Sequence, residues 1–414
     1  MGSYKLRCLG GGELIDDLYA LKCADHPGLL RAEYDAVRLN VRNIDNVFKF
    51  CDWLPSDPII RSRSKPVVFR NEDLNRKLGL NDLWIAFTGY YPKRDAFVTS
   101  CSFKEMEALP TMARMKEQKR KTIVVASAGN TGRAFAQISN ETGTNSLIVV
   151  PKGSGDRIRV SEDKGQSKLI TVGGDYADAI AVAERISSME DFIPEGGAKN
   201  IARRDGMGTV MLESAITMGK IPDHYFQAIG SGTGGISAWE ASMRLMGDGR
   251  FGDRLPKLHL SQNEPFVPMK RAWDDGRANI IPEDMRNADE SISKVYADVL
   301  TNRSPPYGIR GGVYDAMTAC GGRMYGITND EAKDAEKLWM RYEDAVPDPA
   351  ASVALASLIK AAAEGMVPKN GSILLNMTGG GQNLLFDDIQ MTTILPFAEV
   401  RKDISDADLR RLIA

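Results

Sequence analysis

The feature that most constrains this chain is the order of an apolar run, a glycine-containing loop, an amphipathic stretch and a second apolar run. The first run is Thr122–Ala126 and the second is Ser146–Pro151, with the amphipathic stretch Arg133–Glu141 between them. A strand, a helix and a strand in this order form a βαβ unit, whose crossover makes the two strands parallel. Because parallel sheets carry helices on both faces, the chain is predicted to be an α/β protein.

The same alternation continues towards the C-terminus. Further apolar runs predict strands at 168–172, 225–229, 257–260 and 372–375. Helical periodicity predicts helices at 176–189 and 349–365. The segment 273–327 is rich in Arg, Asp, Gly and Pro, and its weak periodicity predicts loops and short helices over the sheet. At 414 residues the chain exceeds one ordinary core, so two or three domains are expected.

The charge balance excludes several classes of function. Lys and Arg total 53 against 55 Asp and Glu, which gives a formal net charge of −2 and no global attraction to nucleic acid or to an anionic membrane. No apolar run approaches the length of a bilayer-spanning helix, and the start of the chain lacks the apolar stretch of a secretory signal. We therefore expect a cytoplasmic protein that binds neither nucleic acid nor membrane.

The five cysteines are odd in number and scattered, which is not typical of a disulfide framework. Cys8, Cys23 and His26 have part of the spacing of a small zinc ribbon, but the ligand expected near Gly11 is absent. A structural zinc ion needs four ligands. The sequence therefore predicts no metal site, and it leaves open whether these three residues keep a metal ion.

Three glycine-containing loops each follow a predicted strand, at 127–132, 230–235 and 378–381. In an open α/β sheet ligands bind outside the carboxyl ends of the strands, so the loops are candidates for one composite site. Any one of them alone is as well explained by a tight turn. The loop at 230–235 is the best phosphate cradle, because its glycines let backbone amides approach an anion at the start of a helix. It is not a P-loop, since Ile236-Ser237 follows its last glycine.

Lys104, which precedes the three glycine-containing loops in the sequence, is a further candidate for the same site. Lys104 follows Phe103 and lies among small polar residues. This environment favours a sheltered amine whose pKa is low enough for Schiff-base chemistry.

The order of these motifs resembles the threonine-synthase branch of the fold-type II pyridoxal-phosphate enzymes. The motifs are Ser-Phe-Lys at 102–104, Ser-x-Gly-Asn-Thr-Gly at 127–132, the glycine-rich loop at 230–235 and Thr-Gly at 378–379. The resemblance implies a tryptophan synthase β-like fold, with two α/β domains, open twisted sheets and the cofactor in the cleft between them. Residues 1–109 would hold the cofactor lysine and part of the large domain, 110–222 the smaller domain, and 223–414 the remainder of the large domain.

The resemblance also implies a role for each motif. Lys104 would bind pyridoxal 5'-phosphate as a Schiff base and later move the Cα proton, and Asn130 would hydrogen-bond the phenolic oxygen of the cofactor. The Thr378 hydroxyl would face the pyridine nitrogen. The cofactor phosphate would bind to Gly230, Ser231, Gly232, Thr233, Gly234 and Gly235. The substrate carboxylate would bind to Ser127, Ala128, Gly129, Asn130 and Thr131.

The segment around Lys104 narrows the range of reactions that the resemblance implies. Threonine synthases usually carry Ser-Phe-Lys-Asp-Arg, whereas this chain has Ser-Phe-Lys-Glu-Met at 102–106. That variant and the N-terminal stretch 23–34 resemble cysteate synthases of methanogens. Their reaction combines O-phospho-L-serine with sulfite to give L-cysteate and phosphate for coenzyme M synthesis. Both the substrate and the product are anionic, and the basic residues in the same part of the chain are Lys152, Arg157, Arg159, Arg203 and Arg204.

Three alternatives stay open. The chain would otherwise be a threonine synthase acting on O-phosphohomoserine, or a cysteine synthase using O-phosphoserine and sulfide, because one methylene or one nucleophile separates these reactions. From a different class, it would be a catalytically silent paralogue that binds a ligand with an inherited fold. Fold-type II enzymes commonly form homo-oligomers, so a homo-oligomer is expected by resemblance.

Overall fold

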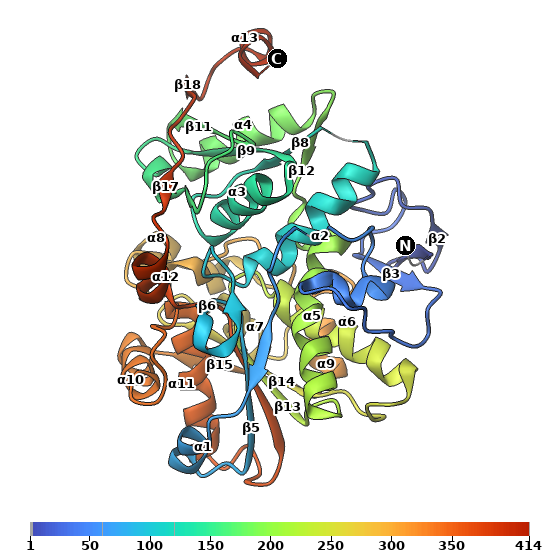
Figure 1. The fold of residues 1–414 in the computed structure, drawn as a ribbon, viewed down its shortest axis with the longest axis vertical. Helices are drawn as coiled ribbons and strands as arrows, with labels where there is room; N and C mark the ends of the chain where they lie inside the picture. The colour runs from blue at the N-terminus through green and yellow to red at the C-terminus, as the bar shows by residue number, and fades with distance from the viewer. Residues whose placement is uncertain (1–2, 60, 120, 414) are drawn as a thin grey trace.

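The computed structural model describes residues 3–59, 61–119 and 121–413. Within these residues two open sheets dominate the fold, one above the other in Figure 1. The larger sheet has six strands in the order β15-β14-β13-β16-β5-β4 in the described part of the chain. Their bounds in that order are Arg323–Ile327, Lys257–Asn263, His224–Ala228, Ser372–Met377, Asp82–Phe87 and Val67–Phe69. All neighbours pair in parallel except β4 and β5, which are antiparallel.

The smaller sheet is parallel throughout its described strands. Its order is β12-β8-β9-β11-β18. The bounds in that order are Phe192–Pro194, Thr122–Val125, Asn145–Pro151, Ser167–Gly173 and Ala398–Arg401. The predicted βαβ unit is confirmed, because β8 and β9 pair in parallel on either side of α3 (Asn130–Thr142).

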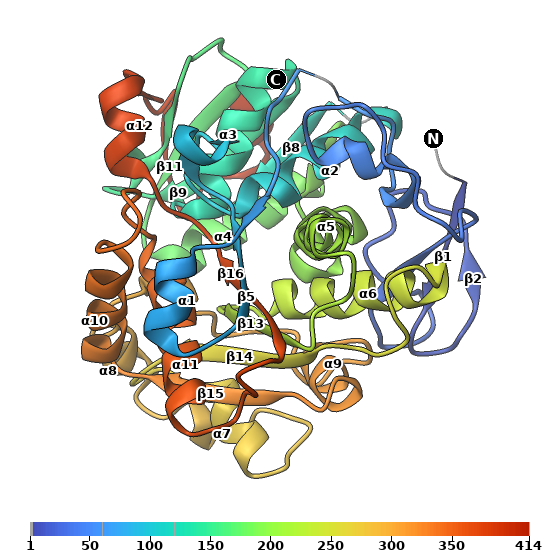
Figure 2. The same ribbon diagram turned by 60° about the horizontal axis from the view of Figure 1, so that its bottom comes forward.

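Helices cover both faces of the larger sheet (Figure 2). Alternate residues of its strands point to opposite faces, as the pleat of a strand requires. Tyr225 packs in the core that includes α5 (Ile201–Met218) and α6 (Thr233–Asp248), whereas its neighbour Phe226 packs in the core that includes α10 (Asn329–Trp339) and α11 (Pro349–Ala363). The buried strands therefore read as continuous apolar runs, which is how the sequence revealed them.

The smaller sheet is covered in the same way. Ile148 and Val150 of β9 pack in the core that includes α3 and α2 (Lys104–Glu117), and Val149 packs with α4 (Tyr176–Ser187) and α13 (Asp406–Ile413). Helix α2 lies between the two sheets in Figure 1 and also packs against α5. The α/β fold with two open sheets is thus confirmed, and α2 carries Lys104 to the junction of the two.

The segment 273–327 corrects the prediction of loops and short helices. It contains the short helix α9 (Val313–Ala319), but it ends in β15, which is an edge strand of the larger sheet. The sequence of β15 is Arg-Met-Tyr-Gly-Ile, and its charged and glycine residues hide the strand pattern. The other unpredicted strands of this sheet are β4 and β5.

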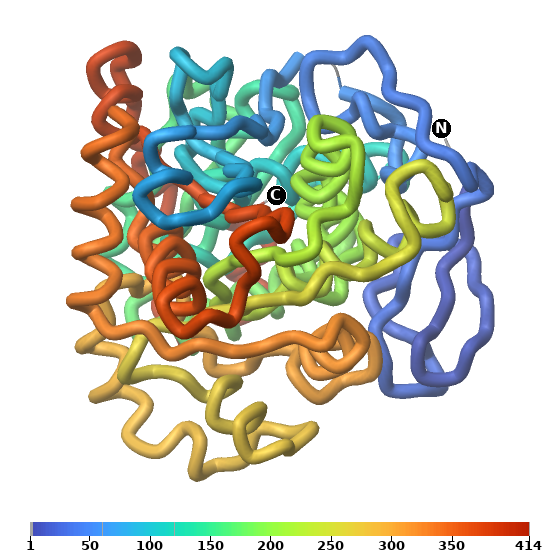
Figure 3. Tube along the Cα trace, turned by 90° about the horizontal axis from the view of Figure 1, so that it is seen from below, coloured from blue at the N-terminus to red at the C-terminus, as the bar shows by residue number. Residues whose placement is uncertain are grey.

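A third, antiparallel sheet lies at the N-terminus, with the order β2-β1-β3 in the residues that are described. Its strands are β1 (Tyr4–Cys8), β2 (Leu14–Ile15) and β3 (Leu30–Tyr34). Figure 3 shows this N-terminal part, in blue, at one side of the molecule. The division into 1–109, 110–222 and 223–414 stays a prediction; β18, from the last of these segments, pairs with β11 of the smaller sheet. Among the described helices, none combines the length and hydropathy that crossing a membrane requires.

Candidate active site

Lys104 begins helix α2, and the loop before it is tied to the loop that follows β16. The Phe103 backbone N–H donates to the Thr378 carbonyl at 2.9 Å, and the Gly380 N–H donates to the Cys101 carbonyl at 3.0 Å. Ser102 and Gly379 form an isolated β-bridge. These backbone contacts bring two of the predicted motifs together, although 274 residues separate Lys104 from Thr378.

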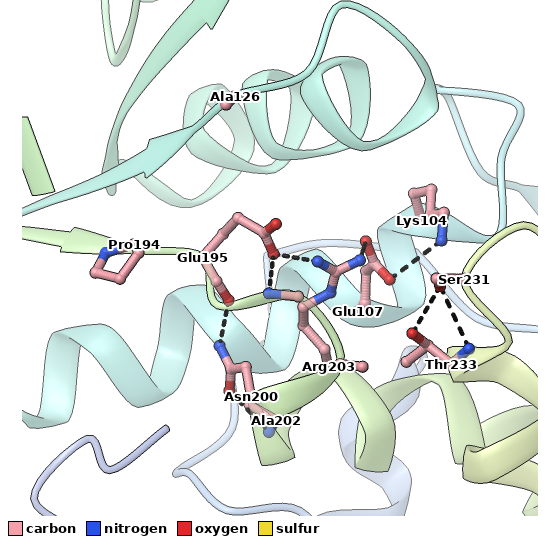
Figure 4. Close-up of polar contacts among 12 residues, drawn as sticks. Lys104, Glu107, Ala126, Pro194, Glu195, Asn200, Ala202, Arg203, Ser231 and Thr233 are labelled. Atoms are coloured by element: carbon pink, nitrogen blue, oxygen red, sulfur yellow. Dashed lines mark hydrogen bonds and ion pairs between the residues drawn. The ribbon is translucent and has the colours of Figure 1, made fainter. Parts of the chain in front are cut away.

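The Lys104 amine faces Glu107, one turn further along α2, and Glu107 in turn contacts Arg203 of α5 (Figure 4). A quarter of its side chain is accessible, and Nζ is 3.5 Å from an oxygen of the buried Glu107 carboxylate. Burial lowers the pKa of Lys104 below its ordinary value, the Arg203 guanidinium lowers it further, and Glu107 opposes both effects. A larger fraction of this amine is therefore uncharged near neutral pH than for a surface lysine, and the uncharged form is the nucleophile and the base.

Glu107 is held by an ion-pair chain that runs to α5. One Nη of Arg203 lies 2.6 Å from Glu107, and the other Nη contacts Glu195 in the loop before α5. The pKa of Arg203 is raised by the two carboxylates, so this buried guanidinium keeps its charge. The pair fixes the position of the carboxylate next to Lys104.

The loop at 230–235 leads from β13 into α6 (Figure 4). Gly232 has a φ of +83°, which favours glycine. The Ser231 and Thr233 hydroxyls share a hydrogen bond at 2.8 Å, and the Thr233 backbone N–H donates to the Ser231 Oγ at 3.3 Å. In Figure 4 the Lys104 amine points towards this turn. The start of a 16-residue helix is a favourable environment for an anion.

The segment 127–131 runs from the end of β8 into the first turn of α3, which begins at Asn130, and the Asn130 side chain reaches Asp348 at the N-cap of α11. The Asn130 Nδ2 donates to the Asp348 carboxylate at 3.4 Å, and Arg133 donates to the Asn130 Oδ1. The Asp348 backbone N–H donates to the Gly379 carbonyl at 3.0 Å. Gly132 is required here because a Cβ would overlap the Ser127 carbonyl. Asp348 therefore links the segment 127–131 to the loop at 378–381, which is itself tied to the loop before Lys104.

The structure thus brings together Lys104, Asn130 and Thr378 by hydrogen-bonded loops, and it turns the loop at 230–235 towards the Lys104 amine. Among the five basic residues noted in the sequence, Arg203 contacts Glu107, whereas Arg204 is buried against Glu240. The remaining three are exposed: Lys152, Arg157 and Arg159.

No role was predicted from the sequence for Glu107, Arg133 or Asp348. Charged residues are usually solvated, and the spacing of Glu107 and Asp348 does not indicate that they are turned inward. The one usable signal is that Arg133 lies one helical turn after Asn130, on the same face of α3.

Comparison with known proteins agrees with this geometry. The family model described as pyridoxal-phosphate dependent enzyme matches residues 74–379. A cysteate synthase of Methanocorpusculum labreanum is 57% identical over 398 residues, covering 95% of this chain and 97% of the relative. A cysteate synthase of Methanosarcina barkeri is 50% identical over 415 residues, covering 99% and 100%.

Solved structures agree on the fold. Maize serine racemase superposes with a TM-score of 0.58 at 15% identity, covering 78% of this chain and 91% of that one. Diaminopropionate ammonia lyase from Escherichia coli superposes with a TM-score of 0.59 at 14% identity, covering 84% and 93%. The chain is therefore a fold-type II enzyme that depends on pyridoxal 5'-phosphate. With relatives this similar over nearly its full length, it belongs to the cysteate synthase family.

The residues present fit this cofactor. A partly accessible lysine of lowered pKa suits the aldehyde, and the glycine-rich helix start towards which it points suits the phosphate.

Proposed function

We propose that this protein converts O-phospho-L-serine and sulfite into L-cysteate and phosphate, in a β-replacement that supplies coenzyme M synthesis in a methanogen. The observation that carries the proposal is the 57% identity to a cysteate synthase across 95% of the chain. The site is compatible with it, because an amine of lowered pKa points, in Figure 4, towards a helix start that favours anions.

Under this proposal the predicted residues keep their roles. Lys104 would bind the cofactor, the residues at 230–235 would hold its phosphate, and Asn130 and Thr378 would hold its ring by hydrogen bonds. The loop at 127–131 binds the substrate carboxylate. When bound, pyridoxal 5'-phosphate supplies an electron sink that stabilises negative charge at Cα. The neutral Thr378 hydroxyl does not favour a protonated pyridine, which favours replacement at Cβ over transamination.

Lys104 is the proposed acid and base. Its amine would take the proton from Cα of the substrate as phosphate leaves Cβ with the electron pair of the C–O bond. Sulfite sulfur then forms the new bond at Cβ, and Lys104 returns the proton to Cα. Burial and Arg203 keep the pKa of this amine low enough for it to accept the proton, and Glu107 remains a counterion for the protonated form.

Arg133 is the proposed contact for the leaving phosphate or the incoming sulfite. Its Nε is buried and has no hydrogen-bond partner in the part of the chain that is described. Its Nη2 donates to Asn130, in the loop assigned to the substrate. A guanidinium with a free donor beside a substrate loop suits a phosphate or sulfonate group. Arg133→Gln is expected to raise the KM for O-phospho-L-serine at least about tenfold, and Arg133→Lys less.

The proposal is tested by supplying the purified protein, loaded with cofactor, with three substrate pairs. O-phospho-L-serine is given with sulfite, then with sulfide, and O-phospho-L-homoserine is given alone. Phosphate release and the amino-acid product are measured for each. We expect cysteate from the first pair at the highest kcat/KM. Three outcomes would overturn the assignment. Threonine as the main product would favour a threonine synthase, cysteine as the main product a cysteine synthase, and no turnover with any pair a catalytically silent paralogue.

We further propose that the protein is a cytoplasmic homo-oligomer. All five cysteines lie in the described residues and are free thiols, and four of them are buried, as is usual in a reducing compartment. Light scattering coupled to gel filtration measures the assembly, and a monomer at micromolar concentration would refute the oligomer.

A further inference from the structure

The N-terminal sheet gathers two thiols, an imidazole and a carboxylate at one point. One ligand atom from each of Cys8, Glu13, Cys23 and His26 lies within 4.8 Å of all the others. The Cys23 Sγ donates to the Glu13 Oε1 at 2.6 Å, and the His26 Nδ1 is 3.2 Å from the same oxygen. The two cysteines are buried, whereas Glu13 and His26 are partly open to solvent. None of these residues takes part in the site around Lys104.

Two turns bring the four residues together. Cys8 ends β1, Glu13 precedes β2, and Cys23 and His26 lie in the loop before β3. The Gly11 backbone N–H donates to the Cys8 Sγ at 3.4 Å, so the first turn folds back over that sulfur. An N–H directed at a cysteine sulfur stabilises a negative charge on it.

Glu13 supplies the ligand that the sequence spacing left out. A Cβ at position 11 would overlap the Glu13 carboxylate and the His26 ring, so Gly11 faces the centre of the cluster without a side chain. The Glu13 carboxylate fills the space that a ligand at position 11 would occupy. The sequence indicated that the ligand expected near Gly11 is absent, because Glu13 reaches that place only through the turn.

The donor set and its spacing suit zinc. Bonds of about 2.0 to 2.3 Å in a tetrahedron separate neighbouring ligand atoms by about 3.3 to 3.8 Å. The observed limit of 4.8 Å requires only small side-chain movements to reach that geometry. Two sulfurs, one imidazole nitrogen and one carboxylate oxygen form a closed tetrahedral set, which is typical of structural zinc.

We propose that Cys8, Glu13, Cys23 and His26 bind one zinc ion as a closed tetrahedral structural site. Each thiol loses its proton when its sulfur bonds to the metal, so two protons are released and the site with neutral His26 carries a net charge of −1. Without the ion, the Cys23 thiol holds its proton in a hydrogen bond to the Glu13 carboxylate, and metal binding must displace that proton. Affinity is therefore expected to rise with pH.

The ion would stabilise a sheet that has little apolar core of its own. The buried cluster around it contains only small or medium side chains within the described residues: Leu6, Cys8, Cys23, Leu30, Ala32 and Ile201. The same sheet holds α5, because the Arg204 Nη2 donates to the Leu30 carbonyl and the Tyr34 hydroxyl donates to Asp205 at 2.6 Å. Helix α5 also carries Arg203, so the zinc site supports the helix that positions Glu107.

The test uses the full chain loaded with cofactor, stripped of metal by a chelator and dialysed against zinc alone. Bound zinc per chain is measured by mass spectrometry, and cobalt substitution is followed by its sulfur-to-metal charge-transfer absorption. The variants are Glu13→Gln, His26→Ala and Cys23→Ser. The matched controls are Glu33→Gln on β3 and Cys51→Ser, which remove the same groups outside the cluster.

We expect one zinc ion per chain, cobalt bands typical of thiolate ligation, and at least tenfold weaker zinc binding in each cluster variant, with both controls unchanged. Glu13→Gln and His26→Ala decide the matter if Cys23→Ser fails to fold, because their side chains are 34% and 51% exposed in the metal-free fold. No zinc retained by the folded wild-type protein would overturn the proposal, as would binding that the variants leave unchanged. Both outcomes are independent of the reaction at Lys104.

Discussion

Glu105 follows the cofactor lysine and is fully buried. Its carboxylate accepts a hydrogen bond from the Ser64 hydroxyl at 2.5 Å and another from the Ser100 backbone N–H. Burial, assisted by the nearby Glu141 carboxylate, raises the pKa of Glu105 to about 8. We predict that Glu105→Gln removes a pH-dependent loss of stability, because glutamine keeps the shape of the side chain and cannot ionise.

The direction in which the free energy of unfolding changes with pH follows from how many protons the folded and unfolded chains bind. Below about pH 4.5 the group is protonated in both states and contributes no pH dependence. Between about pH 4.5 and 8 the unfolded chain releases this proton and the folded chain keeps it, so the free energy of unfolding falls as the pH rises. At about 1.4 kcal/mol for each pKa unit, the loss over this window reaches about 5 kcal/mol.

Urea unfolding of the holoenzyme measures this at a series of pH values across the window. The free energy of unfolding of Glu105→Gln, minus that of the wild type, is expected to become more positive by several kcal/mol from about pH 5 to about pH 8. Glu162→Gln, an exposed residue, is the control and should show no such trend. A difference between Glu105→Gln and the wild type that stays constant across the window would refute a buried, protonated Glu105.

Two further predictions concern the amine and the backbone. Glu107→Gln removes the carboxylate that raises the pKa of Lys104, so the pH at which cofactor binding reaches half its maximum should fall by about one unit in absorbance titrations. An unchanged midpoint would show that Glu107 does not act on the amine. Gly381→Ala should lower the free energy of unfolding by about 2 kcal/mol or more, because Gly381 has a φ of +83° and a Cβ would overlap the Tyr90 carbonyl. Gly247 lies inside α6, and a Cβ added there meets nothing within 4 Å, so Gly247→Ala should raise the free energy of unfolding by up to about 1 kcal/mol. Urea unfolding of the holoenzyme measures both variants, and equal effects of the two changes would contradict this account.

Much of the fold could be predicted from the sequence because buried parallel strands are short continuous apolar runs. The runs that predicted β8, β9 and β16 agree with the observed strands to within two residues at either end. Strand β15 could not be found in this way, since Arg323 and Gly326 interrupt its apolar pattern at the edge of the sheet. Local periodicity carries no information about which sheet a strand joins, so the pairing of β18 with β11 was also out of reach.

The candidate site also has a part that the sequence predicted and a part that it did not. The three loops were predicted because backbone requirements leave glycines in the sequence, as at Gly132 and Gly232. Lys104 was predicted from its small polar neighbours and the Ser-Phe-Lys segment. The charged neighbours could not be predicted, because Glu107 meets Arg203 only through the packing of α2 on α5, across 96 residues of sequence. Glu13 was missed because a turn brings it into the place of residue 11.

The central claim is that Lys104 holds pyridoxal 5'-phosphate and moves the Cα proton. Its most direct test is to reduce the holoenzyme with borohydride, which makes the link between the cofactor and a lysine permanent, and then to map the modified peptide by mass spectrometry. We predict a single pyridoxyl group on Lys104, and no stable modification or cysteate formation in Lys104→Ala. Modification of another lysine, or an active Lys104→Ala variant, would contradict the account.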